Sequence, residues 1–163
     1  MFLSLYGHSQ PVLCLDISYD NRLIITGSSD RNIKIWGLDF GDCHRSLFAH
    51  DDTITAVQFV PKTHLFFSIS KDKKLKYWDA DKFLHIQTLD VREQFRNASF
   101  LFEFLFFKGH CGEIRCMSIT TNGMHIATAA HDRTIRLWER TEEPLILEEE
   151  KEQVRERERE FLN

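Results

Sequence analysis

Long apolar runs, closely paired cysteines and an excess of basic residues are all missing from this sequence of 163 residues. No stretch of 18 apolar residues occurs, so we expect no membrane-spanning helix. The start of the chain has neither the basic residues nor the long apolar stretch of a signal peptide, which predicts an intracellular, reducing compartment. The hydrophobic share of 42% is ordinary for one globular domain.

The net charge of −4 is unevenly distributed. Nine acidic and four basic residues lie at 142–160, so the rest of the chain carries a net charge of only +1. A nearly neutral body lacks the basic surface with which proteins bind a phosphate backbone. The composition therefore gives no argument for direct contact with RNA, and it leaves such contact open.

The four cysteines do not form a metal-binding pattern. A zinc site needs two close pairs, but Cys111 and Cys116 are separated by four residues and Cys14 and Cys43 stand apart. We expect no metal and no other cofactor.

Three segments of the chain align with one another without gaps. In each segment a histidine is followed by a serine or threonine 18 residues later, an aspartate four residues after that, and a tryptophan six residues further on. All three tryptophans of the chain fall in this register. Such agreement indicates a structural repeat of about 40 residues. The three sets are His8, Thr26, Asp30 and Trp36; His50, Ser68, Asp72 and Trp78; and His110, Thr128, Asp132 and Trp138.

Alternating apolar residues follow each of these histidines, at 12–17, 54–59 and 114–119. Turn-forming residues come next, then a second apolar run that leads to the serine or threonine, and a third that ends at the tryptophan. The pattern predicts antiparallel strands. Cys14 and Cys116 share a repeat position with a small alanine, so we interpret both as small buried core residues.

The spacings resemble those of the WD-repeat family, over residues 1 to about 147. The dipeptide that names the family is intact at Trp78-Asp79, whereas the other copies read Trp36-Gly37 and Trp138-Glu139. The resemblance implies a β-propeller in which each of the three sets is a hydrogen-bonded tetrad that fixes one blade.

Serine or threonine, histidine and aspartate are also the components of a hydrolase triad. Three copies of one catalytic set would be redundant, the G-x-S-x-G turn of such hydrolases is absent, and tryptophan has no role in the reaction. We therefore expect no enzymatic activity, no catalytic residue and no small-molecule substrate.

The fold class that follows is all-β: a partial WD-repeat propeller of three four-stranded blades in an open arc, followed by a charged helical tail. Three blades do not close a ring, because propellers have roughly four to eight. We therefore expect a truncated piece of a larger propeller. The expected parts are an orphan outer strand at 1–5, blade one at 6–48, blade two at 49–89, a phenylalanine-rich insertion at 90–107, blade three at 108–147 and a charged helical tail or linker at 148–163.

Residues 90–107 interrupt the repeat. In the repeated sets, His8 and His50 are 42 residues apart and His50 and His110 are 60 apart, and removing residues 90–107 restores the period. It holds six of the fourteen phenylalanines. It could be an apolar hairpin that binds a partner or dips into a membrane, or residues 100–107 could replace 83–89 as the outer strand of blade two. It could also be foreign to the repeat, as in a product of aberrant splicing.

Longer stretches resemble a narrower family. Residues 2–8, 30–44, 47–52, 59–62, 138–141 and 143–150 are similar to tandem-propeller WD-repeat subunits of the small-subunit processome, the nucleolar assembly that matures 18S ribosomal RNA. The resemblance implies a non-catalytic scaffold in the nucleus and nucleolus that contacts other processome proteins and the small nucleolar ribonucleoprotein. The alternative is a WD-repeat adaptor of another complex, such as a substrate receptor of a ubiquitin ligase.

Overall fold

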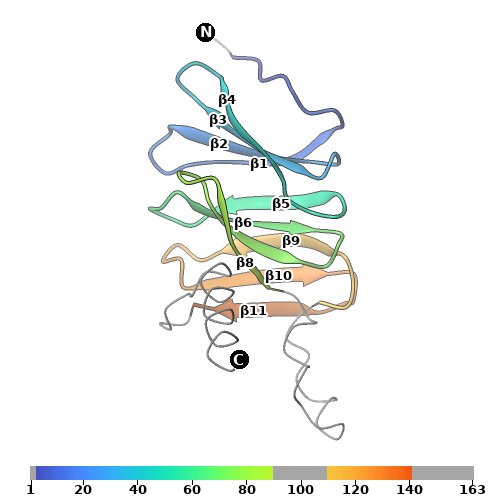
Figure 1. Cartoon of the computed structure of the whole chain (residues 1–163). Coiled ribbons are helices and arrows are strands. Elements are labelled where there is room, and N and C mark those ends of the chain that lie inside the picture. The colour runs from blue at the N-terminus through green and yellow to red at the C-terminus, as the bar shows by residue number, and fades with distance from the viewer. Residues whose placement is uncertain (1–2, 90–109, 141–163) are drawn as a thin grey trace, which may run out of the picture.

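The computed structural model describes residues 3–89 and 110–140. All the regular secondary-structure elements within these ranges are β-strands. The strands form three antiparallel sheets that follow one another along the chain (Figure 1). Blade one consists of β1 (Val12–Ile17), β2 (Leu23–Ser28), β3 (Asn32–Gly37) and β4 (Cys43–Phe48). Blade two consists of β5 (Ile54–Phe59), β6 (Leu65–Ser70), β7 (Leu75–Asp79) and β8 (Leu84–Leu89). Blade three consists of β9 (Ile114–Ile119), β10 (His125–Ala130) and β11 (Ile135–Glu139).

The predicted fold class, an all-β partial propeller, is confirmed. Each sheet is a meander in which neighbouring strands in the sequence are neighbours in the sheet. The sheets are stacked in an arc, with blade one at one end and blade three at the other (Figure 1). The expected fourth strand of blade three, the insertion at 90–107 and the helical tail lie outside the described residues.

Two of the sequence expectations concern outer strands. β8 pairs with β7 from Leu84 to Leu89, so residues 84–89 form the outer strand of blade two, and the alternative at 100–107 lies outside the described residues. At the other end of the chain, residues 3–5 form no strand. An outer strand needs the third strand of its own blade as a partner, and the described residues before Val12 supply none.

The blades repeat one another down to their irregularities. The register between the first and second strands shifts between Val12 and Cys14, and again between Ile54 and Ala56 at the same place in blade two. The turn after each tetrad aspartate has a basic residue in the left-handed region, at Arg31, Lys73 and Arg133, with φ angles of 70°, 71° and 65°. The sequence repeat is therefore a structural repeat residue by residue.

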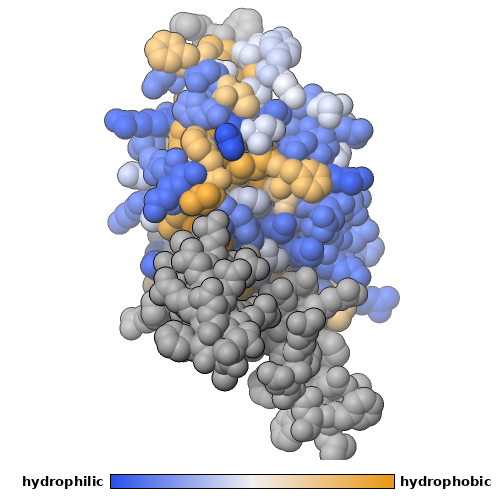
Figure 2. All heavy atoms as spheres, in the orientation of Figure 1, coloured by the Kyte–Doolittle hydropathy of each residue, from blue (hydrophilic) through white to orange (hydrophobic). Residues whose placement is uncertain are grey.

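The core lies between the blades. We call the face of a sheet that turns toward the preceding blade its front face, and the opposite one its rear face. The rear face of blade one and the front face of blade two form one apolar cluster, in which Ile25, Ile33 and Ile35 pack with Val57 and Phe59. A similar seam joins blade two to blade three, where Ile69 and Leu75 pack with Ile114. Figure 2 shows a band of apolar atoms that crosses the first two sheets between hydrophilic rims.

Close approach at the first seam leaves no room for a side chain at Gly27. A Cβ atom there would lie 2.6 Å from Sγ of Cys14 and 2.7 Å from Cγ2 of Ile54. Burial raises the pKa of the Cys14 thiol to about 11, so this thiol stays protonated at neutral pH.

The interpretation of Cys116 as a buried core residue is wrong, because its side chain is exposed. Cys14 occupies the equivalent position in blade one and packs against the seam with blade two. Cys116 lies on the rear face of blade three, and no described blade follows to cover it. The cysteine side chain at this repeat position is thus partly buried where a described blade packs behind it and exposed where none does.

Candidate functional site

The structure brings the four residues of each repeated set into one line of hydrogen bonds. In blade two, Trp78 Nε1 lies 2.8 Å from Ser68 Oγ, which lies 2.8 Å from His50 Nε2. The other ring nitrogen of His50, Nδ1, lies 2.8 Å from Oδ2 of Asp72. The corresponding distances are 2.9, 2.8 and 2.9 Å in blade one and 2.8, 2.8 and 3.0 Å in blade three.

The chemistry of these groups fixes the direction of donation along the line. The indole N–H can only donate, so the Ser68 hydroxyl accepts from it and gives its own hydrogen to His50 Nε2. His50 must then carry its proton on Nδ1, from which it donates to the carboxylate of Asp72. A neutral histidine thus satisfies every polar atom between the indole and the carboxylate.

The pKa values in blade two agree with a neutral histidine beside a charged aspartate. Burial lowers the pKa of His50 below 6.5, and it outweighs the opposite influence of Asp72. Burial alone would raise the pKa of Asp72, but the hydrogen bond from His50 together with those from two backbone amides holds it below 3.8. In blade one the same balance lowers the pKa of Asp30 to about 2.

Each tetrad aspartate also fastens two segments of backbone. Asp72 accepts from the amide of Asp51, 3.1 Å away in the loop that enters the blade, and from the amide of Lys74, 3.0 Å away in the β6–β7 turn. Asp30 and Asp132 make the equivalent pairs of bonds. The carboxylate therefore ties together the loop and the turn on one edge of the blade.

This geometry is unsuited to nucleophilic catalysis. Ser68 is fully buried, and its oxygen is already engaged by the indole N–H and by the imidazole. Thr128 in blade three is 1% exposed and is held in the same way. A nucleophile has to reach its substrate, whereas these hydroxyl groups face protein on every side. The arrangement can orient a blade, and it offers no surface to a reacting molecule.

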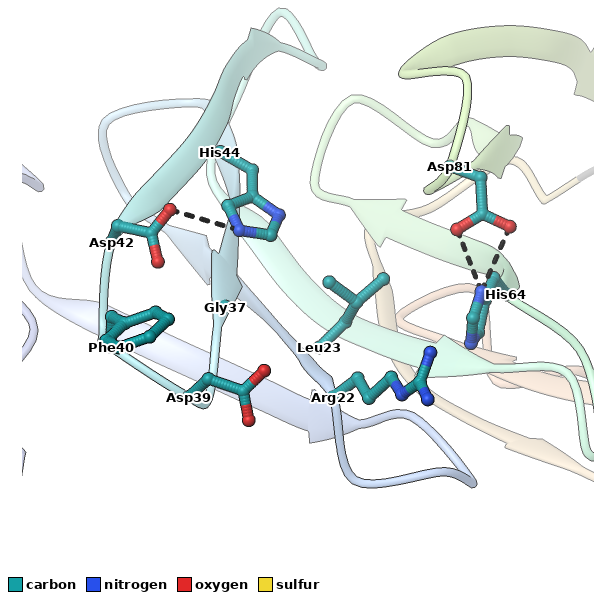
Figure 3. A pocket seen from close by; sticks show the side chains of 9 residues that line it. All are labelled: Arg22, Leu23, Gly37, Asp39, Phe40, Asp42, His44, His64 and Asp81. Atoms are coloured by element: carbon teal, nitrogen blue, oxygen red, sulfur yellow. Dashed lines mark hydrogen bonds and ion pairs between the residues drawn. The ribbon is translucent and has the colours of Figure 1, made fainter.

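An open pocket of about 360 Å³ lies at the edge of the seam between blades one and two (Figure 3). Its charged groups largely satisfy one another, since His44 Nε2 lies 3.1 Å from Asp42 and His64 Nδ1 lies 2.8 Å from Asp81. The pocket is lined by Arg22, Leu23, Gly37, Asp39, Phe40, Asp42, His44, His64 and Asp81.

The side chains of residues 3–89 and 110–140 bring together no group of three or more histidine, cysteine, aspartate and glutamate residues suited to hold a metal. Over the same ranges, the chain contains no helix with the length and apolar character needed to cross a bilayer.

His64 forms a bridge between the blades that the repeat did not reveal. Its Nε2 lies 3.1 Å from Asp20 of blade one, and its Nδ1 lies 2.8 Å from Asp81 of blade two. Burial alone would lower the pKa of His64, but Asp81 and Asp20 outweigh it and raise the pKa above 6.5. The equivalent positions hold Arg22 and Met124, so no repeated pattern in the sequence marks this residue.

Replacing His64 with glutamine should reduce stability in a pH-dependent way. Because the folded pKa lies above the unfolded one, the stability that His64 adds is fully present below pH 6.5 and is lost as pH rises through the raised pKa. We expect the difference in melting temperature between the wild type and His64→Gln to be largest near pH 6 and to shrink toward pH 8. A difference that stays constant over this range would contradict a bridging imidazolium.

Comparison with known proteins places these blades in a family. A family model described as the WDR3 second beta-propeller domain matches residues 1–102. The chain belongs to this family. The WDR3-type match covers blades one and two, and a general model, the WD domain G-beta repeat, matches residues 102–139 and so covers blade three.

Individual relatives of this WDR3-type chain share the repeat. It is 30% identical to Periodic tryptophan protein 2 of Arabidopsis thaliana over 82 residues, which is 50% of this chain and 9% of the relative. It is 29% identical to the p21-activated protein kinase-interacting protein 1-like of Xenopus laevis over 82% of this chain and 31% of the relative. It is 33% identical to the Poly(A)+ RNA export protein of Schizosaccharomyces pombe over 56% of this chain and 26% of the relative. The chain thus spans less than a third of the length of each of these relatives.

Proposed function

We propose that this chain is a non-catalytic scaffold for protein–protein contacts in ribosome biogenesis, as part of the small-subunit processome that matures 18S ribosomal RNA. The match of residues 1–102 to the WDR3 second propeller carries the proposal, because it is narrower than a match to the WD repeat in general. The names of the relatives range from kinase interaction to RNA export, so the repeat alone does not define the partner.

The tetrads support the scaffold part of the proposal. Their serine, threonine and histidine side chains are turned inward and hydrogen-bonded within the blade, so they maintain its shape and leave the outer surface for partners. The partners that the resemblance implies are other processome proteins and the small nucleolar ribonucleoprotein, in the nucleolus.

Affinity purification of the tagged chain tests the proposed function. We expect pre-ribosomal proteins and the small nucleolar ribonucleoprotein to be enriched over a tag-only control, and the tagged chain to be found in nucleoli. Treating the lysate with ribonuclease separates the contacts: proteins that remain bound contact the chain directly or through other proteins, and those that are lost depend on RNA. Enrichment of ubiquitin-ligase adaptors without pre-ribosomal proteins would overturn the proposal.

A further inference from the structure

The pocket at the edge of the seam between blades one and two contains a carboxylate without a partner. Asp39 lies on the β3–β4 turn and is exposed. Among the residues that the structure describes, its carboxylate makes no hydrogen bond and no ion pair. Its repeat equivalent in blade two, Asp81, has both oxygens within 2.8 and 3.0 Å of Nδ1 of His64. The same repeat position is therefore paired in blade two and open in blade one.

The residue that could pair with Asp39 is engaged elsewhere. Arg22 is the repeat equivalent of His64, but its Nε lies 3.7 Å from Oδ2 of Asp20. In Figure 3 its guanidinium group points away from Asp39. The carboxylate of Asp39 therefore faces the pocket without the positive charge that its counterpart has in blade two.

Gly37 gives blade one a hollow beside this carboxylate. A Cβ atom at Gly37 would lie 2.6 Å from Nε2 of His44 and 3.0 Å from Oδ1 of Asp42. Blade two has Asp79 at the same repeat position, and its carboxylate accepts two backbone amides of the β7–β8 turn. The glycine thus leaves space in blade one where blade two has a side chain that closes its turn.

The other groups around the hollow are an aromatic ring, an apolar floor and a second carboxylate. Phe40 is 87% exposed at the rim, so both faces of its ring are open to a ligand. Leu23 lies in the middle of the pocket and is 8% exposed (Figure 3). Asp42 binds His44 through Oδ2 at 3.1 Å and directs Oδ1 toward Gly37, so it can accept a further hydrogen bond.

An arginine side chain fits this set of groups. Its planar guanidinium group has five donors, can bridge two carboxylates and can stack on an aromatic ring at the same time. Its methylene groups can cover apolar surface. The shorter-range point charge of lysine lacks this planar fork. Three of the lining residues are aspartates and one is an arginine, so the charge of the pocket also favours a basic ligand.

We propose that this pocket binds an arginine side chain of a partner protein, with the guanidinium group between Asp39 and Asp42 and beside the ring of Phe40. The methylene groups of the arginine lie over Leu23. The inference rests on the proposed scaffold function and gives it a location on the molecule. The bound arginine donates to Asp39 as His64 does to Asp81 in blade two.

A nuclear magnetic resonance titration of the isotope-labelled full chain with N-acetyl-argininamide tests the pocket. We expect saturable shifts of the backbone amides of the β3–β4 turn, with a dissociation constant on the order of 1 mM for a ligand the size of one residue. The corresponding amide of citrulline has nearly the same shape and no charge. It should bind at least about 10-fold more weakly.

Substitutions in the pocket identify the groups that bind the arginine probe. Asp39→Asn should weaken binding at least about 10-fold, because it removes the charged acceptor. Phe40→Ala should weaken it about 3-fold by removing the ring. Arg22→Gln should tighten binding, because it removes a competing positive charge. Asp39 and Phe40 are exposed, so their variants should keep the wild-type circular dichroism spectrum.

Asp52→Asn is the matched control. Asp52 is an exposed aspartate before β5, and the pocket lies near the other end of that strand, so this variant should bind the probe as the wild type does. Shifts that do not saturate by about 20 mM, or that centre away from the β3–β4 turn, would overturn the proposal. So would equal binding of the citrulline probe, unchanged binding by Asp39→Asn, or weaker binding by Arg22→Gln.

Affinity purification of the double variant Asp39→Asn/Phe40→Ala connects the pocket to partner proteins. We expect the double variant to lose at least one ribonuclease-resistant partner that the wild type and Asp52→Asn retain. Retention of every partner would overturn the pocket as an interaction surface and leave the scaffold function intact. If the arginine probe binds as expected but the wild type enriches no pre-ribosomal protein, the arginine pocket stands and the processome function fails.

Discussion

Replacing Trp78 with alanine should remove about 3–5 kcal/mol from the free energy of unfolding, the typical cost of truncating a buried aromatic side chain. Trp78 is 5% exposed and stacks on Phe66 with ring centroids 6.2 Å apart. It also lies edge-to-face with His85, with ring centroids 4.9 Å apart. The substitution would open a cavity in the core of blade two next to its seam with blade one. The free energy of unfolding of a domain is commonly only about 5–15 kcal/mol, so this substitution would remove much of it.

Trp78→Phe is a milder substitution at the same position. It keeps an aromatic ring in the core but removes the N–H that donates to Ser68 together with part of the indole volume, so we expect a smaller loss than with alanine, of roughly 1–3 kcal/mol. Urea unfolding followed by circular dichroism at one fixed protein concentration measures both variants. If Trp78→Ala lost less than about 1 kcal/mol, the position of Trp78 in the core would be refuted.

Asp72→Ala should lower the free energy of unfolding by about 1–3 kcal/mol, because it leaves donors without their acceptor. The carboxylate accepts from His50 Nδ1 at 2.8 Å and from the amides of Asp51 and Lys74. The side chain of His50 is fully buried, so water would not readily replace the lost acceptor of its Nδ1–H group.

Asp52→Ala is the matched control for Asp72→Ala. Asp52 lies in the loop that enters the same blade and is exposed, and among residues 3–89 and 110–140 its carboxylate accepts a hydrogen bond only from the amide of Thr53. We expect its urea midpoint to stay close to that of the wild type. An Asp72→Ala midpoint that matched the wild type and Asp52→Ala would show that the tetrad adds nothing to stability.

The repeat made the fold and the tetrads predictable, because each tetrad depends only on spacing within one blade. His50 and Ser68 are 18 residues apart in the sequence, and the meander brings them within 2.8 Å in blade two as it does the equivalent residues in blades one and three. His50 lies in the loop before β5 and Ser68 lies on β6, so both belong to the same blade. No longer-range information is needed.

Features that depend on neighbouring blades could not be predicted in this way. Cys14 and Cys116 share a repeat position, yet only the first has a described blade behind it, so one is half-buried and the other exposed. The bridge from His64 to Asp20 joins positions 44 residues apart in two blades and occurs once. A single copy of a contact leaves no periodic signal in the sequence.

A double-mutant cycle in blade two tests most directly whether the tetrad acts as one structural unit. Asp72→Ala and Trp78→Phe alter the two ends of the line of hydrogen bonds that runs through Ser68 and His50. If the hydrogen bonds act as a unit, a substitution at one end already weakens the whole line. A second substitution at the other end then removes less free energy of unfolding than it does in the wild type. We expect the double variant to lose less stability than the sum of the single variants, by about 0.5–3 kcal/mol. Losses that add to within about 0.5 kcal/mol would contradict a tetrad that holds the blade as a single network.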